Sequence, residues 1–210
     1  MTLADIRREY LGQPLDEAHT DADPFRQFSL WFDQVRELES DPTAMALATA
    51  TREGRPSVRT VLLKGVDAQG FVFYTNYHSR KAREIEQTGR ASLLFSWRSL
   101  ERQVRIDGTV EKVTETESDA YFATRPLDSR WSVYASRQSE RIESREALES
   151  RFEVARQIYG DAVPRPRWWG GYRVVPDEFE FWQGRPSRMH DRLQYRKQAE
   201  GSWIRERLAP

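Results

Sequence analysis

The sequence contains no cysteine and only three histidines, His19, His78 and His190. Without cysteine the chain can form no disulfide, no thiolate nucleophile and no thiolate metal site. The three histidines are far apart, and none shows the HExxH-type spacing of a histidine metal site. We therefore expect no metal ion to be involved in its chemistry.

Long apolar runs are missing too. The longest are the length of a strand and too short to cross a membrane. Charged residues begin at Asp5, where a secretory signal would have an apolar segment. We expect a cytoplasmic protein that does not span a membrane.

The common nucleotide-binding and hydrolase fingerprints are also absent. The chain has no GxGxxG after a strand, no GxxxxGK[ST] and no GxSxG. Rossmann folds, P-loop proteins and Ser-His-Asp hydrolases are therefore disfavoured, which leaves anion binding as the chemistry to look for.

Charge is balanced, with 33 basic and 33 acidic residues. Because nucleic-acid-binding domains usually carry excess positive charge, we expect no nucleic-acid partner. Only Lys64, Lys81, Lys112 and Lys197 among the basic residues are lysine. A GC-rich genome explains the excess of arginine, but guanidinium groups also suit phosphate and carboxylate recognition. Composition does not separate these two explanations.

A chain of 210 residues fits one domain. Residues 1–20 are polar and irregular and are expected to form a flexible arm, with a single domain over 21–210. Asp23-Pro24 is a typical helix start, and apolar residues at helical spacing extend this helix to about Ser40.

Most of the remaining chain has the pattern of strands. Runs rich in β-branched and aromatic residues predict strands over 44–50, 57–66, 71–77, 91–97, 102–113, 171–176, 178–183, 190–197 and 202–208. Helices are predicted over 79–88, 116–124 and 144–159. We therefore expect a mainly β protein with helices (α+β), in the form of a small β-barrel decorated by helices.

The start of the helix at 79–88 is the sharpest local sign of an anion site. Ser79 is the expected N-cap, and Arg80 and Lys81 follow it in the first turn. Cations there oppose the helix dipole. The same free backbone N–H groups, with arginine and lysine beside them, suit a phosphate. The alternative is that both side chains are simply solvated.

Other polar groups are weaker candidates. Arg59 and Lys64 are an odd number of residues apart on one predicted strand, so they face opposite ways unless a bulge brings them together. Gln103 follows polar-out alternation on its strand. Tyr121, Arg125 and Ser129 surround a predicted helix C-terminus, and Gln138-Ser139 resembles a helix start.

The stretch FWQGRPSRMHDR, from Phe181 to Arg192, carries more information. If the chain is extended from Arg188 onward, then Arg188, His190 and Arg192 share one face. Three cationic or nearly cationic groups on one face call for an anion between them, and Trp182 can supply a flat wall for a ring.

These residues resemble the pyridoxamine 5′-phosphate oxidase family. FEFWQGRPSRMHDR (179–192) is similar to that family's C-terminal signature. Further segments match in the family's order: RREY (7–10), DPTAM (41–45), RTVLLK (59–64), VFYTN (72–76), SRKA (79–82), SLLF (92–95), LERQVR (100–105), YFATRP (121–126), RQS (137–139), WWGGYRV (168–174) and RLAP (207–210). The resemblance covers essentially the whole chain.

The resemblance implies an FMN-binding split β-barrel that works as a homodimer with FMN at the subunit interface. Family members oxidise pyridoxamine 5′-phosphate or pyridoxine 5′-phosphate to pyridoxal 5′-phosphate. Hydride passes to the flavin, and dioxygen reoxidises it to give hydrogen peroxide, with ammonia released from the amine substrate. This is the last step of vitamin B6 cofactor synthesis and salvage.

The family's site residues carry over to positions in this chain. FMN would be bound by Arg59, Thr60, Val61, Leu62, Leu63, Lys64, Tyr74, Thr75, Arg80, Lys81, Gln103, Gln138, Ser139, Trp182 and Arg192. The substrate would be bound by Arg7, Tyr10, Lys64, Tyr121, Arg125, Ser129, Arg188 and His190, with Arg188 and His190 as the catalytic pair and Arg7 and Tyr10 in a lid.

Two segments depart from the family pattern. Met189 stands where leucine is usual, and Trp131–Tyr134 replaces a segment that commonly contains glycine, which bears on packing beside Gln138 and Ser139. An alternative function is a split-barrel protein that binds flavin or pyridoxal phosphate without oxidase turnover. The presence of Arg125, Ser129, Arg188 and His190 argues against it, because a flavin binder does not need a substrate site.

Overall fold

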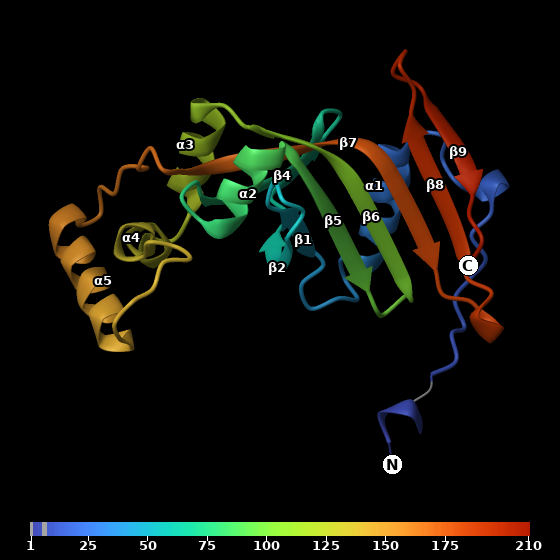
Figure 1. The fold of residues 1–210 in the computed structure, drawn as a ribbon, viewed down its shortest axis with the longest axis horizontal. Coiled ribbons are helices and arrows are strands. Elements are labelled where there is room, and N and C mark those ends of the chain that lie inside the picture. The colour runs from blue at the N-terminus through green and yellow to red at the C-terminus, as the bar shows by residue number, and fades with distance from the viewer. Residues whose placement is uncertain (1, 6–7) are drawn as a thin grey trace.

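The fold is a single curled antiparallel sheet with helices at its side and end. The computed structural model describes residues 2–5 and 8–210, and within them the sheet has nine strands. Their main order is β2-β1-β5-β6-β7-β4-β3, with β8 and β9 continuing from β7 (Figure 1). The sheet coils into a partly open barrel, so the predicted mainly β protein with helices is confirmed.

Most of the predicted elements are confirmed within a few residues. The strands are β1 (Ala44–Ala50), β2 (Pro56–Leu62), β3 (Gly65–Asp67), β4 (Gly70–Asn76), β5 (Arg90–Trp97), β6 (Arg102–Lys112), β7 (Trp169–Gln183), β8 (Asp191–Lys197) and β9 (Trp203–Arg207). The helices are α1 (Pro24–Val35), α2 (Arg80–Thr88), α3 (Glu115–Thr124), α4 (Leu127–Ala135) and α5 (Arg145–Tyr159). No helix in the described part of the chain is long and apolar enough to cross a membrane.

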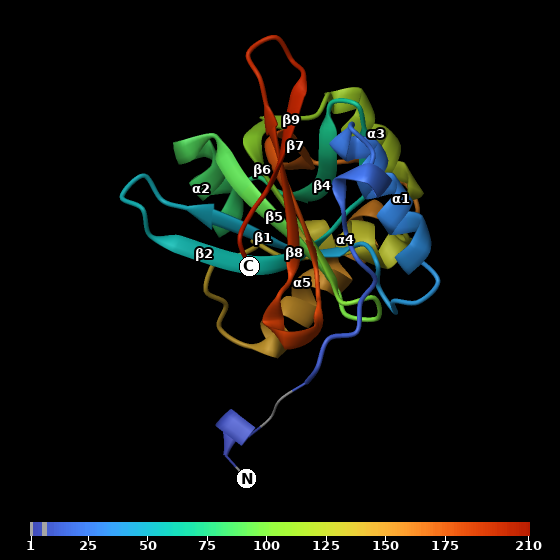
Figure 2. The same cartoon turned by 90° about the vertical axis from the view of Figure 1, so that its right-hand side faces the viewer.

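Helix α1 lies against the sheet and closes the main core. Asp23 caps it by accepting a hydrogen bond from the backbone N–H of Phe25, as the Asp-Pro start predicts. Phe28 is 2% exposed, and its ring packs at 4.9 Å from Phe71 and 5.1 Å from Phe95. The regular helix ends at Val35, earlier than the predicted Ser40. Figure 2 shows α1 beside the coiled strands.

Strand β7 is one continuous strand where the sequence predicts two. It pairs with β4 at its beginning, with β8 at its end and with β6 along nearly its whole length. Pro176 interrupts the pattern, but it lies opposite Gly108, where the register shifts in a β-bulge. A Cβ at Gly108 would lie 2.2 Å from the carbonyl oxygen of Val175, so only glycine lets the strands approach there. The bulge thus carries the strand past a proline.

Helices α4 and α5 form a second, smaller core at one end of the molecule (Figure 1). The sequence did not predict α4, which follows Pro126 and has no side-chain cap. Trp131 is 8% exposed, and its indole N–H donates to the carbonyl oxygen of Gly160 at 2.8 Å. Tyr134 donates to the carbonyl oxygen of Pro164 at 2.7 Å. The departure at Trp131–Tyr134 therefore belongs to the packing between α4 and α5.

Residues 8–15 of the predicted arm run along the end of the sheet. The guanidinium of Arg8 donates to Glu101 at 2.8 Å, and the backbone N–H of Leu11 donates to the same carboxylate at 2.7 Å. Leu15 is 5% exposed and belongs to the main core. The mobility of residues 1–20 and their boundary with a single domain over 21–210 stay predictions.

The start of α3 offers a test of how its capping stabilises the protein. Thr114 and Glu117 form a capping box, in which each side chain accepts a hydrogen bond from the backbone N–H of the other residue. We expect Thr114→Ala to lower the free energy of unfolding by about 0.5–2 kcal/mol, measured by urea denaturation. Thr124→Ala, at the exposed end of the same helix, should change it by less than about 0.5 kcal/mol. Equal effects of the two variants would contradict the capping role.

Candidate active site

A cleft of about 790 Å³ opens between the edge of the sheet and helices α2, α3 and α4. Its walls come from segments far apart in the sequence: strands β2 and β4, the first turn of α2, the end of α3, and α4 with the loop after it. The lining residues are Ser57, Val58, Arg59, Thr60, Val61, Leu62, Lys64, Tyr74, Thr75, Asn76, Arg80, Lys81, Tyr121, Arg125, Ser132, Val133, Ser136, Gln138, Ser139 and Trp169. Thirteen of the predicted site residues are among these twenty, so the fold gathers them into one place.

A break in the predicted strand over 57–66 explains how Arg59 and Lys64 share this cleft. Strand β2 ends at Leu62 and β3 begins at Gly65, so regular alternation does not extend from Arg59 to Lys64. Leu63 lies at the break, is 7% exposed and packs in the main core. The structure thus places Leu63 behind the cleft wall, while Lys64 lies in the wall itself.

The first turn of α2 presents a buried cation to the cleft. Ser79 caps the helix as predicted, and Lys81 in the first turn is only 7% exposed. Its ammonium donates to Thr75 Oγ1 at 3.2 Å and to Gln138 Oε1 at 3.4 Å, both neutral. Across residues 2–5 and 8–210, no carboxylate pairs with it. Desolvation, with the nearby charge of Arg59, lowers the pKa of Lys81 to about 8.

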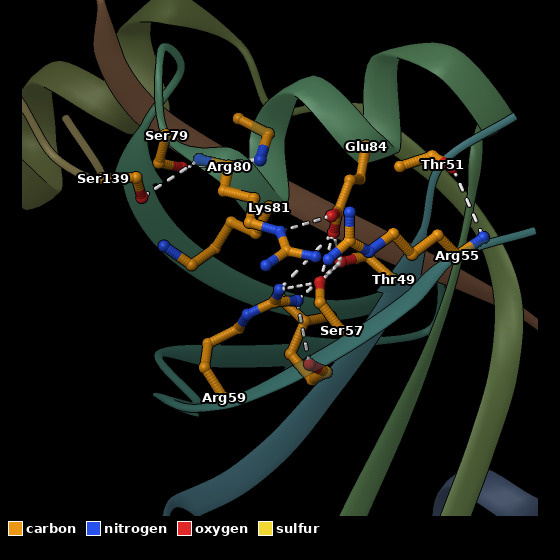
Figure 3. Close-up of polar contacts among 12 residues, drawn as sticks. Thr49, Thr51, Arg55, Ser57, Arg59, Ser79, Arg80, Lys81, Glu84 and Ser139 are labelled. Atoms are coloured by element: carbon orange, nitrogen blue, oxygen red, sulfur yellow. Dashed lines mark hydrogen bonds and ion pairs between the residues drawn. The ribbon is translucent and has the colours of Figure 1, made fainter. Parts of the chain in front are cut away.

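The loop after α4 approaches the same helix start. The backbone N–H of Arg80 donates to Ser139 Oγ at 3.1 Å (Figure 3). Ser139 itself has a left-handed backbone, with φ of 74°. Gln138 and Ser139 therefore do not begin a helix of their own. They complete the polar rim around the first turn of α2, where an anion would be bound by backbone N–H groups and cations together.

Arg59 and Arg80 meet at a buried carboxylate that the sequence did not single out. Glu84 is 3% exposed and accepts hydrogen bonds from Arg80, Thr49 and Ser57 (Figure 3). Arg59 lies 3.5 Å from the same carboxylate. The available signal was helical spacing, since Glu84 follows Arg80 by four residues.

An aromatic wall and a second cation lie at the end of α3. Tyr74 stacks on Tyr121 at 3.9 Å and on Trp169 at 5.5 Å. The guanidinium of Arg125 lies 4.6 Å from the Trp169 ring centre. Its Nη1 is buried and has no hydrogen-bond partner among the described residues, and desolvation lowers the pKa of Arg125. A buried donor of this kind suits an anionic ligand, because the protein itself leaves it unsatisfied. Ser129 is half-buried and is not among the residues that line the cleft. Ser132 and Ser136 of the same segment line it instead.

A second group of predicted residues lies on the far part of the sheet. Gln103, Trp182 and Arg192 are direct neighbours across β6, β7 and β8. Arg192 makes two hydrogen bonds to the carboxylate of Glu180, at 2.7 and 3.1 Å, which raise its pKa. The three form one row with the Trp182 ring at its centre.

His190 and Tyr10 pack around Trp182. The imidazole lies 4.7 Å from the indole and 5.2 Å from the Tyr10 ring. The backbone N–H of Arg185 donates to His190 Nδ1 at 3.1 Å, so a neutral imidazole carries its proton on Nε2. Arg7, predicted with Tyr10 in the lid, lies outside the described residues.

The strand alternation predicted for Arg188 is wrong. Strand β8 begins only at Asp191, and Arg188 lies in a 3₁₀ turn (Pro186–Arg188) with φ of 60°. Alternation therefore does not extend back to this arginine. Its side chain is exposed on a loop at the same end of the sheet as His190 and Arg192.

The two groups of residues lie at opposite ends of β7. Trp169 belongs to the cleft and Trp182 to the row on β6, β7 and β8, about 40 Å apart along an extended strand. Figure 1 shows α3 and α4 near the first end and β8 near the other. One small ligand cannot contact both ends of the same chain.

Comparison with known proteins identifies the family. Residues 32–159 match the sequence model described as pyridoxamine 5′-phosphate oxidase, and residues 169–210 match that of the pyridoxine 5′-phosphate oxidase C-terminal dimerisation region. The second region contains Trp182, Arg188, His190 and Arg192.

Curated relatives match over nearly their whole length. Pyridoxine/pyridoxamine 5′-phosphate oxidases from Rubrobacter xylanophilus and Ralstonia pickettii are 58% and 55% identical, covering 99% and 100% of this chain and 96% and 99% of the relatives. Among solved structures, PhzG from Burkholderia lata, in complex with tetrahydrophenazine-1-carboxylic acid, is 33% identical with a TM-score of 0.89, covering 95% of this chain and 99% of PhzG. An FMN-binding protein related to pyridoxamine 5′-phosphate oxidase, from Nostoc punctiforme, has a TM-score of 0.73 at 19% identity, covering 91% and 100%, and shares the fold. The chain belongs to the pyridoxamine 5′-phosphate oxidase family of split-barrel oxidoreductases.

Proposed function

We propose that this protein is an FMN-dependent oxidase of pyridoxamine 5′-phosphate and pyridoxine 5′-phosphate. With dioxygen, the alcohol gives pyridoxal 5′-phosphate and hydrogen peroxide. The amine consumes one water as well and also releases ammonia. One observation carries the proposal: among the residues that the structure describes, a single cleft is lined by two separate cations without carboxylate partners, the buried Lys81 and the partly buried Arg125. Two phosphorylated molecules side by side, cofactor and substrate, explain both.

The residues at the Lys81 end fit the phosphate of FMN. The first turn of α2 supplies its positive dipole end, the ammonium of Lys81 and the guanidinium of Arg80. Residues 59–62 and 64, with Tyr74 and Thr75, form a wall along which the flavin ring would lie. When bound, FMN supplies the redox chemistry by accepting a hydride and passing electrons to dioxygen.

The Arg125 end fits the substrate phosphate. The buried Nη1 of Arg125 and the hydroxyl of Tyr121 border the cleft beside Lys64. Desolvation raises the pKa of Tyr121, so its phenol stays protonated at neutral pH and can donate to a phosphate oxygen. Ser129 would complete this phosphate site. The protein orients the substrate here through charge and hydrogen bonds.

The catalytic pair would come from the row on β6, β7 and β8. His190 Nε2 is free to hold a proton near the substrate ring, since its Nδ1 accepts from Arg185. Arg188 would orient the reacting carbon, and Gln103, Trp182 and Arg192 would contact FMN. Tyr10, already packed on Trp182 and His190, would cover the substrate with Arg7 as a lid that excludes water.

A second copy of the chain would bring the two groups together. Because the cleft and the row lie at opposite ends of β7, the cleft of one protomer would face the row of its partner. A two-fold symmetric dimer then forms two equal sites from the same pair of surfaces. The match of residues 169–210 to a dimerisation region supports this arrangement.

Reconstitution tests the proposal directly. We expect the protein to bind FMN and to release one peroxide per pyridoxine 5′-phosphate oxidised, measured with a coupled peroxidase assay. Unphosphorylated pyridoxine is the matched control and should react far more slowly, because it leaves the Arg125 end empty. Protein that binds no FMN would contradict the proposal. Protein that binds FMN but oxidises neither phosphorylated vitamer would point to the flavin-binding alternative.

A further inference from the structure

A buried carboxylate lies beneath the proposed phosphate site of the cofactor. One oxygen of Glu84 accepts from Arg80 Nε at 2.8 Å. The other accepts from the hydroxyls of Thr49 and Ser57 and lies 3.5 Å from a terminal nitrogen of Arg59. Figure 3 shows both guanidinium groups converging on it, one from β2 and one from α2. Glu84 therefore connects strands β1 and β2 to helix α2, whose first turn borders the proposed phosphate site.

This carboxylate is charged despite its burial. Desolvation would raise the pKa of Glu84, but hydrogen bonds from Ser57, Thr49 and Arg80 outweigh it and lower the pKa to about 2. A buried carboxylate that stays ionised needs such a complete set of donors. Because Glu84 is ionised across the neutral range, its contacts with the arginines persist there.

The contacts leave one arginine immobilised and the other directed at the cleft. Arg59 also donates to the carbonyl oxygen of Leu47, to Thr49 and to Ser57, so its terminal nitrogens are fully engaged. Arg80 is held only through Nε. Its terminal nitrogens have no partner in the described part of the chain, and the side chain is 48% exposed where it lines the cleft.

The local charges also match a phosphate. Arg59, Arg80 and Lys81 contribute three positive charges and Glu84 one negative charge, which leaves an excess of two. A phosphate monoester carries a charge of about −1.5 to −2 at neutral pH. Without Glu84 the three cations would repel one another, and the nearby charge of Arg59 already disfavours protonated Lys81.

We infer that Glu84 is a positioning residue for the cofactor phosphate: it fixes Arg59 and aims Arg80, and so determines how strongly the site prefers FMN to riboflavin. This inference rests on the proposed function, since it takes FMN as the ligand. Glu84 itself does not contact the ligand, because its carboxylate is enclosed by protein donors.

The test is the phosphate preference of Glu84→Gln. Dissociation constants for FMN and for riboflavin would be measured by quenching of flavin fluorescence in protein freed of flavin. Gln cannot accept at both positions as a carboxylate does, so Arg80 loses its fixed direction. We expect the FMN constant to rise roughly three- to tenfold while the riboflavin constant stays within about twofold.

Competing roles predict different results. If Glu84 acted only through its charge, removing it would make the site more positive and FMN would bind more tightly, which overturns the inference. If it only stabilised the fold, FMN and riboflavin would weaken together as the melting temperature falls. Glu86→Gln, an equal charge change on the exposed side of α2, is the matched control and should alter neither constant.

Glu84→Asp keeps the charge and covers the case in which the glutamine variant fails to fold. Its shorter side chain cannot reach Arg80 and the two hydroxyls together, so the preference for FMN should still fall. An unchanged preference in this variant would refute positioning. Wild-type protein that binds FMN no better than riboflavin would instead refute the proposed cofactor, so the two failures are distinguishable.

Discussion

Two variants of low activity should restore activity to each other when they are coexpressed. Arg125→Ala would remove the charged contact that we propose with the substrate at the cleft, and Arg188→Ala would remove the one proposed at the opposite end of the same chain. Each contact is worth roughly 1.5–3 kcal/mol, so each variant alone should lose roughly 10- to 150-fold in kcat/KM. In a random mixture of two-fold dimers, half are mixed and one of their two sites is intact. Coexpression should thus return about a quarter of wild-type activity.

The physical basis is the separation of the two arginines. Arg125 lies beside Trp169, where β7 begins, and Arg188 follows Gln183, where β7 ends. Only a site built from two chains can use both. Differently tagged chains, purified through both tags, would isolate the mixed dimer, in which half of the wild-type activity is expected.

The matched control pairs two variants from the same end. Arg125→Ala with Lys81→Met should show no recovery, because every site in their mixed dimers has a damaged cleft. Recovery in this control, or none in the Arg125 and Arg188 pair, would mean that the two groups do not meet across an interface.

Replacing Lys81 should have the largest effect on cofactor binding. The ammonium is buried and, within residues 2–5 and 8–210, has only neutral partners, so a phosphate would add a charged contact. Loss of such a contact in Lys81→Met should raise the dissociation constant of FMN roughly 10- to 150-fold. Riboflavin, which lacks the phosphate, should be much less affected. Lys112→Met, at the exposed end of β6, is the matched control and should leave both constants unchanged.

The same lysine predicts a pH dependence. Its pKa in the free protein is lowered to about 8, and a bound phosphate favours the protonated form. Above pH 8 the site must therefore take up a proton to bind FMN, and affinity should fall by up to about tenfold per pH unit. The phosphate itself adds no slope there, because its second pKa is about 6. A titration from pH 7 to 10 should show this fall in wild type and none in Lys81→Met. Equal slopes in the two proteins would contradict the role of Lys81.

Local patterns predicted the elements well, because capping residues and strand composition act over a few residues. Asp23-Pro24, Ser79 and the run at 44–50 each begin or form the element expected. The elements that the sequence analysis missed depend on contacts with residues far away in the sequence. Pro176 could stay inside a strand because the register shifts beside it, opposite Gly108, which is far away in the sequence. Helix α4 has no cap to mark it and depends on packing against α5.

In the candidate site, too, features set by neighbouring residues could be predicted and features set by distant contacts could not. The helix-start motif was readable because all its parts are adjacent in sequence. Glu84 was missed because its partners Thr49 and Ser57 come from two other strands. Strand alternation misplaced Arg188, since this residue lies in a 3₁₀ turn and the extended strand begins only at Asp191. The division of the site into two ends of β7 depends on the topology of the sheet, which no local pattern contains.

The placement of β7 also determines the order in which the protein can fold during synthesis. In the part of the chain that the structure describes, β4 pairs otherwise only with the short β3, and β6 otherwise only with β5. Both therefore keep an open edge until β7 is made. The pairing of Phe71 with Val174 joins segments about a hundred residues apart, and contacts of that separation form slowly. A nascent chain that has not yet reached Gln183 therefore exposes two unpaired strand edges at once. Such edges are where aggregation begins, so the interval before β7 leaves the ribosome is when the chain most needs protection.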